Sequence, residues 1–340
     1  MPNSPDTRLK ALSTWLSQDL KLAVGDLLPA SSDASFRRYF RAQVGDDSFI
    51  VMDAPPAHED VRPFIKVSRL LRSAGVQAPK IHAHDIDRGF LLLCDFGTRQ
   101  YLDSLDEDSA DQLYADAMET LVRLSKGVAI QSCGLPPYDE ARLRGEIDLF
   151  GEWFLARLLE RETTPQEQSV LEKTWRLLVE SALEQTTVCV HRDYHSRNLM
   201  ITETDNPGVL DFQDAVIGPV TYDLVSLLRD CYISWPQDRV ERWVRQYHRR
   251  LLDDGLVTET HAERFLRWFD LMGMQRHIKV LGIFSRLNLR DGKTGYLKDI
   301  PRTLNYVTGV CERHPEMADF LALLQDGIVQ QTYSLLGKPS

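Results

Sequence analysis

The sequence is organised around two polar stretches, residues 191–198 (His-Arg-Asp-Tyr-His-Ser-Arg-Asn) and residues 210–214 (Leu-Asp-Phe-Gln-Asp). Short β-prone runs flank them, at residues 187–190, 199–202 and 209–212, and the last two runs are separated by an Asp-Asn-Pro-Gly turn. This pattern predicts a strand, a polar loop and then a short hairpin that returns the chain toward the loop.

The returning hairpin predicts that Asp211 lies close to Asn198 and Asp193, so that three oxygen-bearing side chains meet at one loop edge. Oxygen ligands of this kind suit Mg²⁺, which takes one or two protein carboxylates and keeps its remaining positions for water and substrate phosphates. An acid that does not bind the metal can accept a proton from an attacking hydroxyl. The stretch therefore predicts a Mg²⁺ site beside a carboxylate that can accept a proton.

The spacing His-x-Asp-x-x-x-x-Asn, followed by Asp-Phe, resembles the catalytic and metal-binding loops of the protein-kinase-like superfamily. The interior Tyr-His-x-x-Asn and the ending Asp-Phe-Gln-Asp are similar to the aminoglycoside phosphotransferase and choline kinase branch, which phosphorylates small molecules. The resemblance implies that Asp193 is the catalytic base or orients the acceptor hydroxyl. It also implies that Asn198 and Asp211 hold Mg²⁺, with His191 and Asp223 as structural supports of the loop.

Length and composition agree with a globular enzyme. A chain of 340 residues exceeds the usual size of one core, so two lobes are expected. The net charge of −10 argues against nucleic acid and anionic membranes as partners. The five scattered cysteines, the polar first residues and the lack of a long apolar run predict a cytoplasmic protein with reduced thiols. The sequence leaves the oligomeric state open.

Hydrophobic periodicity changes along the chain. Strand patterns at 40–44, 48–53, 81–85 and 89–95 dominate the first part, with helical patterns around them. After Gly97 the patterns are mostly helical. We therefore predict an α+β, bilobal protein-kinase-like fold. Its small β-rich lobe would be residues 1–95, its hinge residues 96–101, and its large, mainly helical lobe residues 102–340.

The nucleotide side departs from protein kinases, because no Gly-x-Gly-x-x-Gly is present and Met52 occupies the strand position that usually carries a phosphate-binding lysine. Arg37, Arg38 or Arg41 could supply the missing charge, although a solvated strand face explains these arginines equally well. The resemblance implies that ATP contacts a serine-containing loop, one of these arginines, the backbone of the hinge and an apolar floor. The corresponding residues are Ser31, Ser32, Asp33, Ser35, Arg37, Leu93, Cys94, Asp95, Met200 and Leu210.

Asp95-Phe96-Gly97 spells the metal-binding motif of protein kinases, but it precedes the catalytic loop, whereas that motif should follow it. It also closes the apolar run at residues 90–94. We interpret it as part of the hinge and assign the metal role to Asp211.

The acceptor is suggested by a basic region between Arg267 and Arg302, which contains eight Lys and Arg against three Asp. Such a region favours an anionic or neutral acceptor over a polycationic one, although a solvated basic helix face is an equally simple explanation. Short motifs, among them Arg-Arg-Tyr-Phe-Arg at 37–41 and Met-Asp-Ala-Pro-Pro at 52–56, resemble bacterial anomeric kinases of amino sugars. The candidate substrate-binding residues are Asp214, Asp230, Arg276, Arg286 and Arg290.

The resemblance implies ATP- and Mg²⁺-dependent phosphorylation of the anomeric hydroxyl of N-acetylmuramate and N-acetylglucosamine, in the recycling of cell-wall sugars. Two alternatives stay open. One is a kinase of another small molecule, such as an aminoglycoside, choline or homoserine. The other is a catalytically inactive binding protein with a kinase fold, which Met52 suggests and the joint presence of Asp193, Asn198 and Asp211 argues against.

Overall fold

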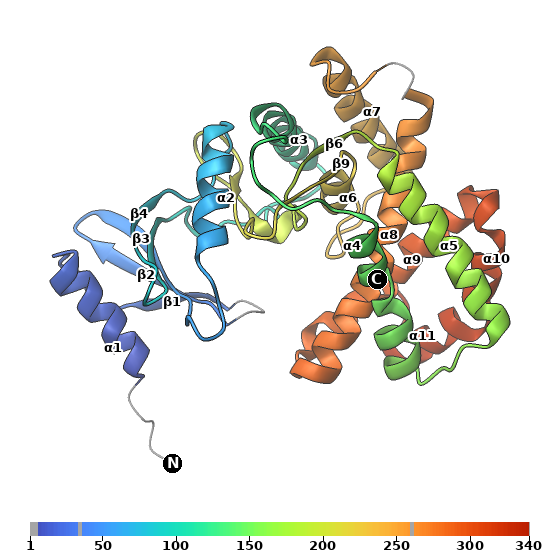
Figure 1. The fold of residues 1–340 in the computed structure, drawn as a ribbon, viewed down its shortest axis with the longest axis horizontal. Coiled ribbons are helices and arrows are strands. Elements are labelled where there is room, and N and C mark those ends of the chain that lie inside the picture. Colours follow the sequence, from blue (N-terminus) through green and yellow to red (C-terminus); the bar gives the residue numbers. More distant parts are fainter. Residues whose placement is uncertain (1–5, 33–35, 259–261, 340) are drawn as a thin grey trace. The chain divides into compact units, whose positions relative to one another are not determined.

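The structure is a computed structural model that describes residues 6–32, 36–258 and 262–339. It divides into two compact units (Figure 1). The first contains residues 1–100 together with 198–214, and the second contains residues 101–197 together with 215–340. The boundaries of the hinge that the sequence predicts, between residues 95 and 101, stay a prediction. A small antiparallel sheet in one unit and helices in the other confirm the predicted fold class.

The first unit is built on an antiparallel sheet in the order β1-β2-β3-β5-β4. Its strands agree with the alternating patterns of the sequence, except that β1 was not predicted. The elements are α1 (Thr7–Thr14), a π-helical turn (Trp15–Asp19), β1 (Leu28–Ser32), β2 (Arg38–Val44), β3 (Asp47–Asp53), α2 (Arg62–Ser73), β4 (Ile81–Asp85) and β5 (Phe90–Cys94). Apolar side chains of α1 and its π-helical turn form a core with the sheet: Leu12, Trp15, Leu16, Phe40, Ala42, Val51, Phe90 and Leu92.

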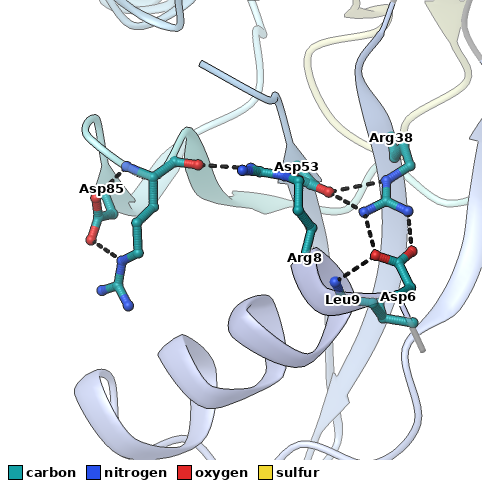
Figure 2. Close-up of polar contacts among 7 residues, drawn as sticks. Asp6, Arg8, Leu9, Arg38, Asp53 and Asp85 are labelled. Carbon is teal, nitrogen blue, oxygen red and sulfur yellow. Dashed lines mark hydrogen bonds and ion pairs between the residues drawn. The ribbon is translucent and has the colours of Figure 1, made fainter. Parts of the chain in front are cut away.

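A buried carboxylate fastens α1 to this sheet (Figure 2). Asp53, at the end of β3, has no exposed surface and accepts hydrogen bonds from Arg8 Nε at 2.8 Å and Arg38 Nε at 3.0 Å. Asp6 caps α1 by accepting from the Leu9 backbone N–H at 3.0 Å, and it also pairs with Arg38. A buried charge is costly unless it is paired, so these arginines make the burial of Asp53 tolerable and fix the helix in register with the strand.

The hairpin that carries the second polar stretch packs within the first unit. It consists of β7 (Leu199–Met200) and β8 (Gly208–Val209), which are shorter than predicted. Hydrogen bonds from Ile201 N to Arg99 O and from Val209 N to Gln77 O, both 2.8 Å, attach it to neighbouring backbone. A Cβ at Gly208 would lie 2.6 Å from the Phe96 ring, so only glycine permits this approach. β8 ends early because Asp211 has a φ of 61°, which no ladder residue adopts.

The second unit is helical apart from β6 (Thr187–Val190) and β9 (Val216–Pro219), which pair antiparallel. Its helices are α3 (Ala110–Gly127), α4 (Glu140–Ile147), a π-helical segment (Phe150–Leu158), α5 (Pro165–Leu183), α6 (Tyr222–Leu228), α7 (Gln237–Asp253), α8 (Ala262–Asp291), α9 (Ile300–Arg313), α10 (Ala318–Leu323) and α11 (Val329–Leu336), with a 3-10 segment (Thr294–Asp299) before α9.

The long helix α8 organises this unit, because α4, α5, α6, α7 and α9 all pack against it (Figure 1). Gly282 allows the backbone near Leu149 to approach, since a Cβ there would lie 2.5 Å from the Leu149 carbonyl carbon. Trp268 and Phe269 are buried on the same helix, as are the charged Arg276 and Lys279. Among the described residues, no helix is long and apolar enough to cross a membrane.

Candidate active site

The first polar stretch forms a loop of the second unit after β6, and α6 holds it in place. Asp223, in the first turn of α6, accepts hydrogen bonds from the backbone N–H groups of His191 at 2.6 Å and Arg192 at 2.9 Å. Arg192 has a φ of 79°, which is uncommon for a residue other than glycine. The two bonds to Asp223 stabilise this unusual backbone. The geometry agrees with a supporting role for Asp223, and burial raises the pKa of Asp223 to about 6.

Asp193 follows Arg192 in this loop. Burial favours its neutral form, but the positive charge of Lys279 and the neighbouring His195 and Arg276 outweigh burial and hold the pKa of Asp193 below its usual range. The Asp193 N–H donates to His191 Nδ1 at 3.2 Å, which agrees with a bracing role for His191. Asp193 is therefore an ionised carboxylate at neutral pH, able to accept a hydrogen bond or a proton.

A buried charge network below this loop was not predicted from the sequence. The Glu146 carboxylate of α4 binds the Arg192 guanidinium, the Tyr138 hydroxyl and, at 3.2 Å, Lys279 Nζ of α8. Lys279 also donates to the Tyr222 hydroxyl at 3.0 Å. Burial favours the neutral form of Glu146, but Lys279 and Arg192 keep its pKa below the usual range. The network links α4, α6 and α8 to the residue before Asp193.

The second polar stretch brings Asn198 and Asp211 together in the first unit. Asn198 Nδ2 lies 3.5 Å from Asp211 Oδ2, and Leu210 N donates to Asn198 O at 2.9 Å. Gln213 Nε2 donates to Asp211 Oδ1 at 2.8 Å. One carboxylate and one amide oxygen are a donor set that fits Mg²⁺, which needs few protein ligands when phosphates and water supply the others. In the described part of the chain, no three His, Cys, Asp or Glu side chains form a metal site.

The three arginines considered as replacements for a strand lysine have different partners. Arg37 Nη2 lies 3.4 Å from Asp211 Oδ1, and its side chain is 10% exposed. Arg38 is bound to Asp53 and Asp6 (Figure 2). Arg41 binds the Asp95 carboxylate at 2.5 Å. Arg37 is thus the arginine of the three that lies at the predicted metal site.

Asp95 is held by groups of its own unit. Its carboxylate accepts hydrogen bonds from Arg41, from Ser48 Oγ at 2.6 Å and from Gly97 N at 2.8 Å. Burial favours the neutral acid, but the bonds from Arg41 and Ser48 keep the pKa of Asp95 below its usual range. These contacts agree with a structural rather than metal-binding Asp95 side chain. Leu93 pairs with Ile50 in the sheet ladder.

Comparison with known proteins identifies the family. Residues 26–266 match the model of the phosphotransferase enzyme family. The chain belongs to this family. Its relatives include N-acetylmuramate/N-acetylglucosamine kinases of Pseudomonas putida, 47% identical over 94% of this chain and 97% of the relative, and of Pseudomonas aeruginosa, 48% identical with the same coverage. A third, from Neisseria meningitidis, is 43% identical over 92% of this chain and 94% of the relative. The chain is therefore a phosphotransferase.

Solved structures support the fold of this phosphotransferase. An ADP-bound aminoglycoside phosphotransferase is similar with a TM-score of 0.58, 16% identity and coverage of 88% of this chain and 97% of that one. An ethanolamine kinase of Plasmodium vivax has a TM-score of 0.63 and 12% identity, and the match covers 92% of this chain and 89% of that one. At such identities the likeness establishes the fold and nothing more.

Other predicted nucleotide contacts of the phosphotransferase are placed only in part. Asp33 and Ser35 lie outside the described residues, and so do the side chains of Ser31 and Ser32, whose backbone belongs to β1. Cys94 is half-buried, and its Sγ accepts a hydrogen bond from Lys80 N at 3.1 Å. In the hairpin, Met200 is buried and Leu210 is half-buried. Their contact with a nucleotide stays a prediction.

The predicted sugar contacts have different surroundings, and their contact with a sugar stays a prediction. Asp214 is exposed in the first unit. Asp230, buried in the second unit, accepts hydrogen bonds from Ser196 N at 2.9 Å and Tyr232 N at 3.0 Å, so it holds two loops together. Arg276 is buried, with Nη1 3.6 Å from Cys231 Sγ.

Four basic residues of the predicted basic region are paired with carboxylates. Arg267, Lys279, Arg290 and Arg302 pair with Glu316, Glu146, Asp291 and Asp299, respectively. Arg286 is half-buried on α8. A count of charges along the sequence therefore overstates the positive charge available to an acceptor, because it ignores these pairs.

Proposed function

We propose that this phosphotransferase transfers the γ-phosphoryl group of ATP to the anomeric hydroxyl of N-acetylmuramate and N-acetylglucosamine. The relatives with 43–48% identity, which match over more than nine-tenths of the chain, carry this proposal because their names specify kinases of these two sugars. The products would be sugar 1-phosphates. The reaction would take place in the cytoplasm, where ATP is available, and would return cell-wall sugars to metabolism.

Asp193 is the acceptor-side residue in this proposal. Its carboxylate is ionised, and Lys279 favours the ionised form. Phosphoryl transfer is loose and depends mainly on positioning and charge neutralisation, so a strong base is not needed. An anomeric hydroxyl is more acidic than an ordinary alcohol because the ring oxygen stabilises its anion. A carboxylate of low pKa that orients the hydroxyl and takes up its proton late in the transfer fits such an acceptor.

The nucleotide side of the proposal uses Asn198, Asp211 and Arg37. Asn198 and Asp211 would hold Mg²⁺, which neutralises phosphate charge when bound. Arg37, whose guanidinium is 3.4 Å from Asp211, would bind phosphate oxygens in place of the absent strand lysine. Guanidinium groups bind phosphate through two parallel hydrogen bonds, so one arginine can hold a phosphate in a fixed orientation.

The decisive experiment is to incubate the protein with ATP, Mg²⁺ and each sugar, and then to assay reducing ends and acid lability of the product. A sugar 1-phosphate has no reducing end and is hydrolysed in mild acid, whereas a 6-phosphate keeps its reducing end and resists mild acid. Gentamicin, choline and homoserine serve as comparison acceptors. A reducing, acid-stable product, or faster turnover of a comparison acceptor, would reject the assignment.

The magnesium assignment is tested by Asp211→Asn, with Asp95→Asn as the matched control. Asp211→Asn replaces an ionised ligand by a neutral amide, so the Mg²⁺ concentration needed for half-maximal activity should rise about tenfold or more. Asp95→Asn should leave the Mg²⁺ requirement unchanged, because Arg41 and Ser48 bind that carboxylate. The reverse pattern would exchange the roles of the two residues.

A further inference from the structure

The catalytic loop carries an exposed arginine that neither the motif nor the family relationship explains. Arg197 lies four residues after Asp193 and immediately before Asn198. Its guanidinium lies over the ring of Tyr232, 4.5 Å from the ring centroid. Contact of this kind fixes the plane of the guanidinium while leaving N–H donors at its edge available. The side chain is therefore held in place without being neutralised.

Arg197 differs in its charged neighbours from Arg192, Lys279 and Arg302. Arg192 and Lys279 share the Glu146 carboxylate, and Arg302 lies 3.6 Å from Asp299. Within the part of the chain whose side chains the structure describes, no carboxylate lies within ion-pair distance of Arg197. Asp299 acts on Arg197 electrostatically, but its carboxylate is shared with Arg302. An anion can therefore bind Arg197 without displacing a carboxylate.

Aromatic rings connect Arg197 to the reacting end of the loop. The Tyr232 ring is 5.4 Å from the His195 ring and 6.4 Å from Phe284, which is 5.1 Å from Tyr296. His195 N donates to Asp193 O at 3.0 Å. Half-buried Tyr232 and Tyr296 leave ring surface accessible. Aromatic surface with a few fixed polar groups is typical of a small-molecule site.

This surface is rigidly tied to the catalytic loop. Asp230 accepts hydrogen bonds from Ser196 N at 2.9 Å and from Tyr232 N at 3.0 Å, and it has almost no exposed surface. Tyr232 and residues 195–197 therefore keep a fixed relation to each other. Arg197, Tyr232, Tyr296, His195 and Asp193 belong to the same unit.

We propose that Arg197 is the specificity-determining residue that binds the carboxylate of an acidic sugar acceptor, with Tyr232 as the ring that supports it. This inference rests on the proposed function, in which the carboxylate is the lactyl group that N-acetylmuramate has and N-acetylglucosamine lacks. The arginine makes charge-assisted hydrogen bonds to the acid and has no partner in the neutral sugar. Arg197, and not the basic region between Arg267 and Arg302, is then the proposed site for the acceptor carboxylate.

The test compares Arg197→Ala, Arg197→Lys and the wild type on three acceptors: N-acetylmuramate, its methyl ester and N-acetylglucosamine. Loss of a charge-assisted contact should raise the KM of Arg197→Ala for N-acetylmuramate about 10- to 100-fold. The KM values for the neutral ester and N-acetylglucosamine should change less than about threefold, as should the KM for ATP. Arg197→Lys should recover part of the loss, because the charge remains without the planar pair of donors.

Arg245→Ala is the matched control, because Arg245 is exposed on α7 and pairs with Glu241 one turn earlier. It should leave all three acceptors unchanged, and thermal unfolding should verify that each variant is folded. An unchanged preference for the acid over its ester in both Arg197 variants would overturn the inference, as would a rise confined to the KM for ATP. A wild-type protein that phosphorylates none of the three sugars would instead overturn the proposed function.

Discussion

Glu146→Gln is the substitution that most directly tests whether the buried charge network positions the catalytic loop. The Glu146 side chain is 15% exposed and lies against two cations, Arg192 and Lys279, whose side chains are 20% and 9% exposed. The neutral amide would leave both cations buried beside one weak acceptor. Removing one member of a buried ion pair costs about 3–5 kcal/mol, and water at the partly exposed Arg192 should reduce this to about 2–4 kcal/mol.

The loss should appear in both stability and turnover. Urea unfolding at neutral pH should show the reduced free energy of unfolding. Because Arg192 directly precedes Asp193, a displaced Arg192 should lower kcat about 10- to 100-fold, as small misplacements of reacting groups do. The KM for ATP should stay near the wild-type value. Glu172→Gln is the surface control: its bond to Arg144 is solvent-exposed, so its loss should cost less than about 1 kcal/mol.

Combining Lys279→Met with Glu146→Gln distinguishes an energetic coupling between these two side chains from a simple loss of packing at each. If Glu146 and Lys279 stabilise each other, the double variant should lose less stability than the sum of the single variants, by about 1–3 kcal/mol. Additive losses, together with an unchanged kcat in Glu146→Gln, would refute the reasoning, because each side chain would then act alone and at a distance from the reaction.

Three further predictions follow from other parts of the molecule. Arg37→Ala should raise the KM for ATP about tenfold in steady-state kinetics with little change for the sugar, whereas Arg41→Ala should not. Asp53→Asn should lower the free energy of unfolding by about 2–3 kcal/mol in urea titrations, against less than about 0.5 kcal/mol for exposed Asp60→Asn. Burial lowers the pKa of His277 to about 3. Below pH 6.5 the unfolded chain therefore binds a proton that the folded protein does not, so the free energy of unfolding decreases as the pH is lowered. Between pH 7 and pH 5, this decrease should be about 2 kcal/mol smaller in His277→Phe than in the wild type.

Much of the fold, and the local geometry that brings Asn198 and Asp211 together, followed from the sequence because the signals are local. Alternating residues predicted β2 to β5, and the spacing of Asp193, Asn198 and Asp211 predicted one loop and one hairpin. The left-handed backbone of Arg192 and Asp211 had no sequence signal, because glycine is the usual residue there. Both strained positions occur in the motif and are held by hydrogen bonds: the Arg192 N–H donates to Asp223, and Gln213 donates to the Asp211 carboxylate.

The ion pairs of the site could not be predicted from the spacing of residues in the sequence. Glu146, Arg192 and Lys279 come from three distant segments, and the only signal was a lysine placed among apolar residues of a helix. The basic region of α8 was overestimated for the same reason, because a count of charges ignores the carboxylates that the fold brings to them. An arginine that the fold leaves exposed, fixed and without such a carboxylate is the most available to an acidic acceptor. Arg197 meets these three conditions in the same loop as Asp193, the proposed catalytic residue, so we infer acceptor specificity from it and not from the larger cluster of charges.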